Sequence, residues 1–159
     1  SSGRTLKAAG VMLATAESCT GGWVAALVTS ISGSSAWFDR GFVTYTNEAK
    51  EEMLGVSHAT LVTHGAVSEP TAREMAAGAI ANSRAHIAVS ITGVAGPTGG
   101  TPAKPVGTVC FGWARRGEQP ESTTRRFDGD RTAVRRQAVI FALEGVAARL
   151  ADASPPSSA

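Results

Sequence analysis

The sequence predicts an α/β fold of three layers, in which helices cover both faces of a mixed, partly parallel sheet. Two observations support this prediction. Short apolar or β-branched runs alternate along the chain with alanine-rich runs of helical spacing, as strands alternate with helices in α/β proteins. Late in the chain, two strand-like runs follow each other across a short polar segment, which indicates an antiparallel hairpin.

Length and composition indicate one domain with one continuous core. The chain has 159 residues, of which 43% are hydrophobic, enough to bury a core without disulfides or metal ions. We expect a single domain over residues 1–150. Residues 151–159 are small, polar and rich in proline, which predicts a disordered tail.

Charge and cysteine content argue against several classes of protein. Fifteen basic and thirteen acidic residues leave a formal charge of +2, so a nucleic-acid partner is not favoured. Cys19 and Cys110 form no CxxC pair, so neither a disulfide framework nor a zinc site is indicated, and a reducing cytoplasm fits best. No apolar run approaches the roughly 18 residues that cross a bilayer, so no membrane partner is expected.

The first half of the chain predicts two strand–helix pairs. The apolar run 11–14 predicts a buried strand that ends in a polar loop, and residues 20–31 follow at helical spacing. Residues 40–47 are β-branched and aromatic, and they predict a second strand that stops at Asn47. Asn47 is a good helix cap, so we expect a short helix over 47–55 that Gly55 closes.

The second half of the chain predicts a helix, three strands and a long final helix. Ser68 is expected to cap an alanine-rich helix that has Pro70 in its first turn. A buried strand then leads into a glycine-rich loop within residues 86–100, and two further strands follow. Asp130 is expected to cap the last helix, whose apolar stripe consists of Val134, Ala138, Phe141 and Gly145.

Three loops that follow strands are candidates for a ligand site, since ligands of open α/β sheets gather at the carboxyl ends of strands. They are residues 15–22, 90–100 and 127–131. In the second loop, four glycines could direct backbone N–H groups toward one anion, and Thr92 adds a hydroxyl. The glycine spacing matches neither a dinucleotide fingerprint nor a P-loop, and a plain flexible connection is the alternative. The four glycines are Gly93, Gly96, Gly99 and Gly100.

Arg131 lies in the first turn of the last helix, where a lone cation opposes the helix dipole. An arginine at this position is better explained by binding an anion such as a phosphate than by helix stability. Arg135 and Arg136 are expected to be solvated surface residues. Ser18 and Thr20 lie at the entrance of an earlier helix, where a hydroxyl can simply cap a backbone N–H.

Lys50 is a candidate general base if burial or a neighbouring cation lowers its pKa. Tyr45 on the preceding strand could relay a proton or orient the amine, and Ser34 or Ser35 could attack a carbonyl. Backbone N–H groups at the helix entrance 18–22 could then bind the oxyanion. The alternatives are an ordinary exposed lysine and a Tyr/Lys reductase pair, which the absence of a nucleotide fingerprint weakens.

Histidine and cysteine provide no strong alternative site. The three histidines lack the helical spacing of a zinc hydrolase, so no metal and no cofactor is expected. Cys19 could be nucleophilic at a helix entrance, but it ranks behind the serines because no histidine is near it in sequence.

Five motifs together resemble the CinA C-terminal domain family, and within it the stand-alone nicotinamide-nucleotide amidohydrolases. The similarity extends from about residue 5 to 150, with the motifs in the same order and at matching spacing. They are "TAESCTGGWVAALVT", "SGSSAWFDRGFVTYTNEAK", "HGAVSEPTAREMA", "SITGVAGPTGGTPAKPVGTV" and "FDGDRTAVRRQA".

The resemblance implies hydrolysis of the carboxamide of nicotinamide mononucleotide to nicotinate mononucleotide and ammonia, in pyridine nucleotide recycling. It implies a metal-independent Ser/Lys mechanism with Ser35 as nucleophile, Lys50 as general base, Tyr45 as its partner and Ser18 in support. Either Ser35 or Ser18 could be the attacking group, because both match family motifs. The residues that would bind the substrate are Thr20, Gly21, Thr92, Gly93, Gly96 and Arg131.

Two hypotheses from different classes follow. The first is the amidohydrolase, whose partner is a small mononucleotide. The second is a non-catalytic nucleotide-binding or competence-associated module that has kept the fold. A homo-oligomer is a further expectation, because the alanine-rich face of residues 72–81 could pack against another subunit.

Overall fold

The computed structural model describes residues 6–8 and 10–151. Its centre is a five-stranded sheet in the order β2-β1-β3-β4-β5. Strand β1 (Leu13–Glu17) is parallel to β2 (Phe38–Val43) and to β3 (Ile87–Gly93). Strands β4 (Thr108–Arg115) and β5 (Glu121–Arg126) continue the sheet as an antiparallel hairpin beside β3. The predicted mixed sheet with a late hairpin is therefore confirmed.

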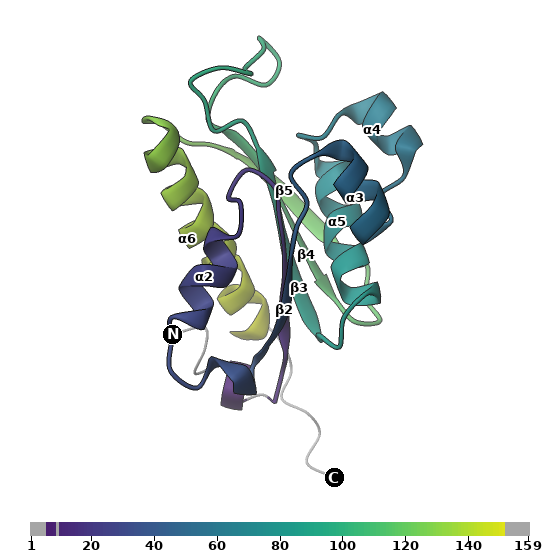
Figure 1. The fold of residues 1–159 in the computed structure, drawn as a ribbon, viewed down its shortest axis with the longest axis vertical. Coiled ribbons are helices and arrows are strands. Elements are labelled where there is room, and N and C mark those ends of the chain that lie inside the picture. Colours follow the sequence, from purple (N-terminus) through teal and green to yellow (C-terminus); the bar gives the residue numbers. More distant parts are fainter. Residues whose placement is uncertain (1–5, 9, 152–159) are drawn as a thin grey trace.

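Helices cover both faces of the sheet, which gives the three predicted layers (Figure 1). Helices α2 (Trp23–Thr29) and α6 (Arg131–Ala151) lie on one face. Helices α3 (Asn47–Leu54), α4 (His58–His64) and α5 (Glu69–Ala81) lie on the other. Of the predicted tail, Ala151 ends α6, and residues 152–159 lie outside the described residues.

Each face of the sheet has its own apolar core. One core includes Val24 of α2 and Val134 of α6, and the other includes Leu54 of α3 and Met75 of α5. Strand β1, between these layers, is buried along its whole length, including its polar residues Thr15 and Glu17. No helix in the described part of the chain combines the length and apolarity needed to cross a bilayer.

Two of the expected N-terminal helix caps are confirmed, whereas α2 begins after Gly22, and neither Ser18 nor Thr20 caps it. The Ser68 side chain accepts a hydrogen bond from Thr71 N (3.2 Å), and Asp130 Oδ1 accepts one from Ala133 N (2.9 Å). At α3, however, the expected cap at Asn47 is wrong. The cap is Thr46, in extended conformation, whose side chain accepts a hydrogen bond from Ala49 N at 3.0 Å. The cap therefore lies one residue earlier than predicted.

Two expectations about helices are corrected. Helix α4 is absent from the sequence prediction because its seven residues include a β-branched run and bury only Leu61. The alanine-rich face of α5 packs inward on the sheet, where Ala72, Ala76 and Ala79 are fully buried. That face therefore gives no argument for a second subunit, and a homo-oligomer stays a prediction.

Strand direction gathers three loops at one edge of the sheet. Because β1, β2 and β3 are parallel, the residues that follow them meet at the same end. Glu17, the last residue of β1, pairs with Val43 of β2 and with Ile91 of β3. Ser18, Tyr45 and Thr92 consequently come together, although the sequence separates them widely.

Candidate active site

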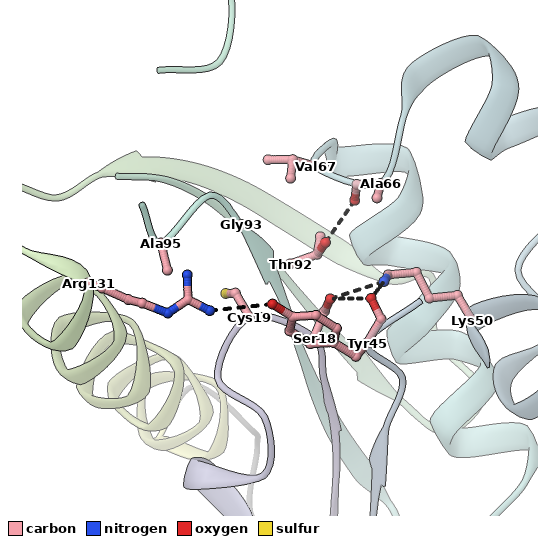
Figure 2. A pocket seen from close by; sticks show the side chains of 10 residues that line it. All are labelled: Ser18, Cys19, Tyr45, Lys50, Ala66, Val67, Thr92, Gly93, Ala95 and Arg131. Atoms are coloured by element: carbon pink, nitrogen blue, oxygen red, sulfur yellow. Dashed lines mark hydrogen bonds between the residues drawn. The ribbon is translucent and has the colours of Figure 1, made fainter. Parts of the chain in front are cut away.

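A pocket of about 240 Å³ opens at this edge of the sheet (Figure 2). Its wall combines a hydroxyl, a thiol, an amine and a guanidinium with small apolar side chains. Lys50 and Arg131 reach toward it from opposite sides, one from α3 and the other from α6. The ten lining residues are Ser18, Cys19, Tyr45, Lys50, Ala66, Val67, Thr92, Gly93, Ala95 and Arg131.

Lys50 is buried, and its amine is held by two backbone carbonyls. Only 1% of the residue is exposed. Nζ lies 2.9 Å from Thr44 O, 3.2 Å from Tyr45 O and 3.0 Å from Ser18 Oγ. Among the described residues, no carboxylate is within ion-pair distance of this amine. Burial therefore lowers the pKa of Lys50 below its ordinary value.

This arrangement suits a neutral amine that acts as a base. A neutral lysine has two N–H groups and one lone pair, and the two carbonyls can accept both N–H groups. The lone pair is then left for the proton of Ser18 Oγ, 3.0 Å away. The geometry thus supplies a nucleophile with its base and needs no histidine.

The loop that carries Ser18 also offers free backbone donors. Ser18 N donates to Ile91 O, and Gly21 N donates to Ser18 O, both at 3.0 Å. The N–H groups of Cys19 and Thr20 donate to no oxygen acceptor in the described part of the chain. Free N–H groups directly after a nucleophile can stabilise the oxyanion that forms when it attacks a carbonyl.

Glu17 is a buried carboxylate that the sequence analysis missed. It is 1% exposed and immediately precedes Ser18. Its oxygens accept hydrogen bonds from Thr20 Oγ1 (2.6 Å), Val24 N (2.9 Å) and Ala25 N (3.0 Å). Glu17 therefore ties the loop to the start of α2. An acidic residue that ends an apolar strand just before a helix is the signal that could have revealed it.

The guanidinium of Arg131 reaches the pocket from the first turn of α6. It donates to Gly96 O at 2.7 Å and lies 3.4 Å from the Tyr45 hydroxyl. No carboxylate pairs with Arg131 among the described residues, so its positive charge is available to an anionic ligand. The Tyr45 hydroxyl thus contacts Arg131, and only the main-chain carbonyl of Tyr45 contacts Lys50.

Comparison with known proteins identifies the family. The family model of the CinA C-terminal domain matches residues 1–150. The chain belongs to the CinA C-terminal domain family. The nicotinamide-nucleotide amidohydrolase PncC of Escherichia coli K12 is 61% identical over 144 residues, which are 89% of this chain and 86% of that protein.

Other CinA relatives agree with this result. The nicotinamide-nucleotide amidohydrolase PncC of Pseudomonas putida is 51% identical over 144 residues, which are 91% of this chain and 89% of that protein. The crystal structure of the competence/damage inducible protein CihA from Agrobacterium tumefaciens superposes with a TM-score of 0.89 at 49% identity. That match covers 94% of this chain and 90% of the other.

In this CinA domain, Ser35 does not come near Lys50. Ser35 lies exposed on a short 3-10 helix, Ser34–Ala36, that precedes β2, whereas Lys50 follows β2. The six residues of β2 extend about 20 Å at about 3.3 Å per residue. The strand thus separates the two side chains within the chain. Ser18 is the serine whose Oγ lies 3.0 Å from Lys50 Nζ, and the catalytic roles of Ser35 and Ser18 stay predictions.

The predicted binding residues of this CinA domain divide into two groups. Thr92 and Gly93 line the pocket with Arg131, and the Thr92 hydroxyl donates to Ala66 O at 2.8 Å. Gly96 contributes through its carbonyl, which holds Arg131. Thr20 and Gly21 are not among the residues that line the pocket. Thr20 is fully buried with its hydroxyl on Glu17, which explains why it cannot reach a ligand.

Cys19 lines the pocket, but its thiol is poorly suited to attack a carbonyl. Burial raises the pKa of the Cys19 thiol to about 11, so it stays protonated at neutral pH and is a poor nucleophile. In the described ranges, no group of three or more His, Cys, Asp and Glu side chains is placed to hold a metal ion. The groups of the pocket that are suited to catalysis are therefore Ser18, Lys50 and the backbone N–H donors.

Proposed function

We propose that this CinA domain hydrolyses the carboxamide of nicotinamide mononucleotide to nicotinate mononucleotide and ammonia, in pyridine nucleotide recycling. The observation that supports this most is the 3.0 Å contact between Ser18 Oγ and the buried amine of Lys50. An amide supplies the carbonyl that such a pair attacks. The relative from Escherichia coli that carries the name of this activity is 61% identical.

Lys50 begins the reaction as the neutral base. Its lone pair takes the proton of Ser18 while Oγ attacks the carboxamide carbon, and the electron pair of the C=O bond moves to oxygen. The N–H of Cys19, which lines the pocket, stabilises this oxyanion. The pyridinium ring of the substrate is itself positive, so its approach further favours the uncharged form of Lys50.

Lys50 then acts as the acid and afterwards as a base again. When the oxyanion collapses, the C–N bond breaks, and the Lys50 ammonium gives its proton to the leaving nitrogen, which departs as ammonia. An ester on Ser18 remains. Lys50 next takes a proton from water, whose oxygen attacks the ester carbon, and it returns that proton to Ser18 Oγ as nicotinate is released.

The remaining pocket residues fit the rest of a mononucleotide. The charge of Arg131 suits the phosphate, and the hydroxyl of Thr92 adds a polar contact. Ala66, Val67 and Ala95 form a small apolar wall that a flat pyridine ring could contact. We further propose a cytoplasmic location, because Cys19 and Cys110 are both free, as is usual in a reducing compartment.

Ammonia release from nicotinamide mononucleotide tests the proposal with three variants. Ser18→Ala and Lys50→Met should each lower kcat by at least about 10³-fold, because each removes one half of the nucleophile–base pair. Ser35→Ala is the matched control, since it removes an exposed serine hydroxyl and should leave kcat within about twofold of wild type.

Three outcomes would contradict the proposal or part of it. An active Ser18→Ala variant with an inactive Ser35→Ala variant would exchange the roles of the two serines. Full activity of Lys50→Met would remove Lys50 as the base. Binding of the nucleotide by the wild type without ammonia release would support the alternative, a non-catalytic nucleotide-binding module.

A further inference from the structure

Arg135 of helix α6 holds the loop that carries Ser18. Its Nε donates to Cys19 O at 3.0 Å, and its NH2 group donates to Thr20 O at 3.1 Å. The guanidinium also lies over the Trp23 ring, 5.4 Å from the centroid. Among the described residues, no carboxylate pairs with Arg135. Arg135 is thus not the solvated surface residue that the sequence suggests, because its polar contacts go to the two carbonyls that follow Ser18.

These two contacts fix the direction of backbone N–H groups. In a planar trans peptide, the C=O and N–H bonds point in opposite directions. Among the described residues, the one cis peptide joins Gly96 to Pro97, so both peptides of the loop are trans. Because Arg135 binds the Cys19 carbonyl, the N–H of Thr20 in the same peptide points away from the arginine. This N–H lies in fully buried Thr20, so the N–H of the loop that lines the pocket is that of Cys19, one residue earlier.

Glu17 holds the same loop from the interior. Its carboxylate accepts from the Thr20 hydroxyl at 2.6 Å, while Arg135 binds the Thr20 carbonyl from α6. Thr20 is fully buried between these contacts. The loop would otherwise be free to turn, since Gly21 and Gly22 have φ values of 58° and 101°. The side chain of Thr20 is therefore held by the negative Glu17, and its carbonyl by the positive Arg135.

We infer that Arg135 is a positioning residue that holds the loop 18–22 in the conformation in which Ser18 Oγ can attack and the N–H of Cys19 can bind the oxyanion. The inference rests on the amidohydrolase function proposed above. Arg135 does not line the pocket, so it acts through Cys19 and Thr20 and not on the substrate. Its loss should therefore affect the transition state more than substrate binding.

The matched control is Arg136, the next residue of the same helix. Arg136 is exposed, and its side chain makes no hydrogen bond or ion pair with the described residues. Arg135→Ala and Arg136→Ala remove the same charge at adjacent positions. Arg135→Lys keeps the charge but loses the planar pair of donors that reaches two carbonyls at once.

Steady-state kinetics of ammonia release provide the first measurement. Arg135→Ala should lower kcat by about 10²-fold with KM within about threefold of wild type, as expected when an oxyanion donor is misplaced. Arg135→Lys should recover part of kcat, and low millimolar guanidinium should partly restore Arg135→Ala. A loss of stability alone would lower the active fraction and would not respond to guanidinium. Arg136→Ala should match wild type.

Labelling of Ser18 by a fluorophosphonate provides a second measurement that does not depend on the natural substrate. The adduct also places negative oxygen at the loop, so Arg135→Ala should be labelled at least about tenfold more slowly than wild type and Arg136→Ala. If wild type is labelled but releases no ammonia, the proposed substrate is wrong and the labelling rates still test Arg135. Equal labelling or equal kcat in Arg135→Ala and wild type would overturn the inference, as would a change in KM alone or the absence of any labelling of wild type.

Discussion

Lys50 shows how the surroundings of one side chain change its chemistry. In the sequence it is one lysine in a polar helix, "NEAKEEML". In the structure it is almost fully buried and points at Ser18. Both the neutral and the charged amine can donate to the two carbonyls. Burial, in contrast, disfavours only the charged amine and so lowers the pKa. Position in the fold, and not residue type, makes it the candidate base.

The lowered pKa of Lys50 predicts a pH dependence of turnover. The base form of a group with a lowered pKa appears at lower pH, so kcat/KM should rise with pH with a midpoint below the ordinary lysine value of 10.5. A pH–rate profile of ammonia release measures this, with Ser35→Ala as a control that should give the same profile. A midpoint at or above pH 10.5 would contradict the role assigned to Lys50.

Sequence motifs identify Ser18 and Ser35 as candidates but do not show which of them lies beside Lys50. Both serines lie in motifs of the family, and spacing along the chain does not decide between them. Strand direction decides which serine lies beside Lys50, because Ser18 follows β1, whereas Ser35 precedes β2. A residue before a strand and a residue after it lie at opposite edges of a parallel sheet. Glu17 and Arg135 could not be predicted as partners of one loop, because their contacts depend on how α6 packs.

At the scale of elements, capping residues were the most reliable guide. Ser68 was predicted as a cap of α5 from its place before Glu69 and Pro70, and its hydroxyl both accepts from Thr71 N and donates to Gly65 O. Helix α4 lacks such a contact, since the Ser57 side chain makes no capping hydrogen bond. That difference explains why one helix could be predicted and the other could not, because propensity and periodicity are weak in a seven-residue helix.

The two caps give a stability prediction with an internal control. Ser68→Ala should reduce the free energy of unfolding by about 1 kcal/mol, because the N–H of Thr71 and the Gly65 carbonyl each lose a partner. Ser57→Ala removes an equivalent hydroxyl without a capping bond and should change stability by less than about 0.5 kcal/mol. Urea unfolding of both variants measures the difference. Equal losses would show that the Ser68 hydroxyl does not stabilise α5.

On the scale of the whole molecule, the site joins the two helical layers. Lys50 comes from the layer of α3, α4 and α5, and Arg131 and Arg135 come from α6 on the opposite face (Figure 1). Ser18 lies between them at the end of the central strand β1. The layers and the mixed sheet could be predicted from alternating patterns. The place where residues of the two helical layers meet at the site could not be predicted, because it depends on how the side chains of each core pack against the sheet.

Substitution of Gly78 in α5 tests how firmly α3, the helix that carries Lys50, is held against α5. A Cβ at this position would lie 1.9 Å from the Leu54 carbonyl at the end of α3, so α3 or α5 would have to move. Gly78→Ala should therefore lower the free energy of unfolding by about 2–4 kcal/mol, although alanine favours helices. Ala77→Ser, at an exposed neighbouring position, should cost less than about 1 kcal/mol. Thermal and urea unfolding measure both variants, and a Gly78→Ala variant as stable as wild type would mean that α3 moves freely.

The contact between Arg135 and the loop after Ser18 joins residues 116 positions apart, whereas Ser18 and Lys50 are 32 apart. During synthesis, the nucleophile and its base thus leave the ribosome long before the arginines of α6. A nascent chain halted before α6 would carry the Ser18–Lys50 pair without the side chain that orders its loop. Reactivity at Ser18 is therefore expected to be postponed until α6 has left the ribosome and packed against the sheet.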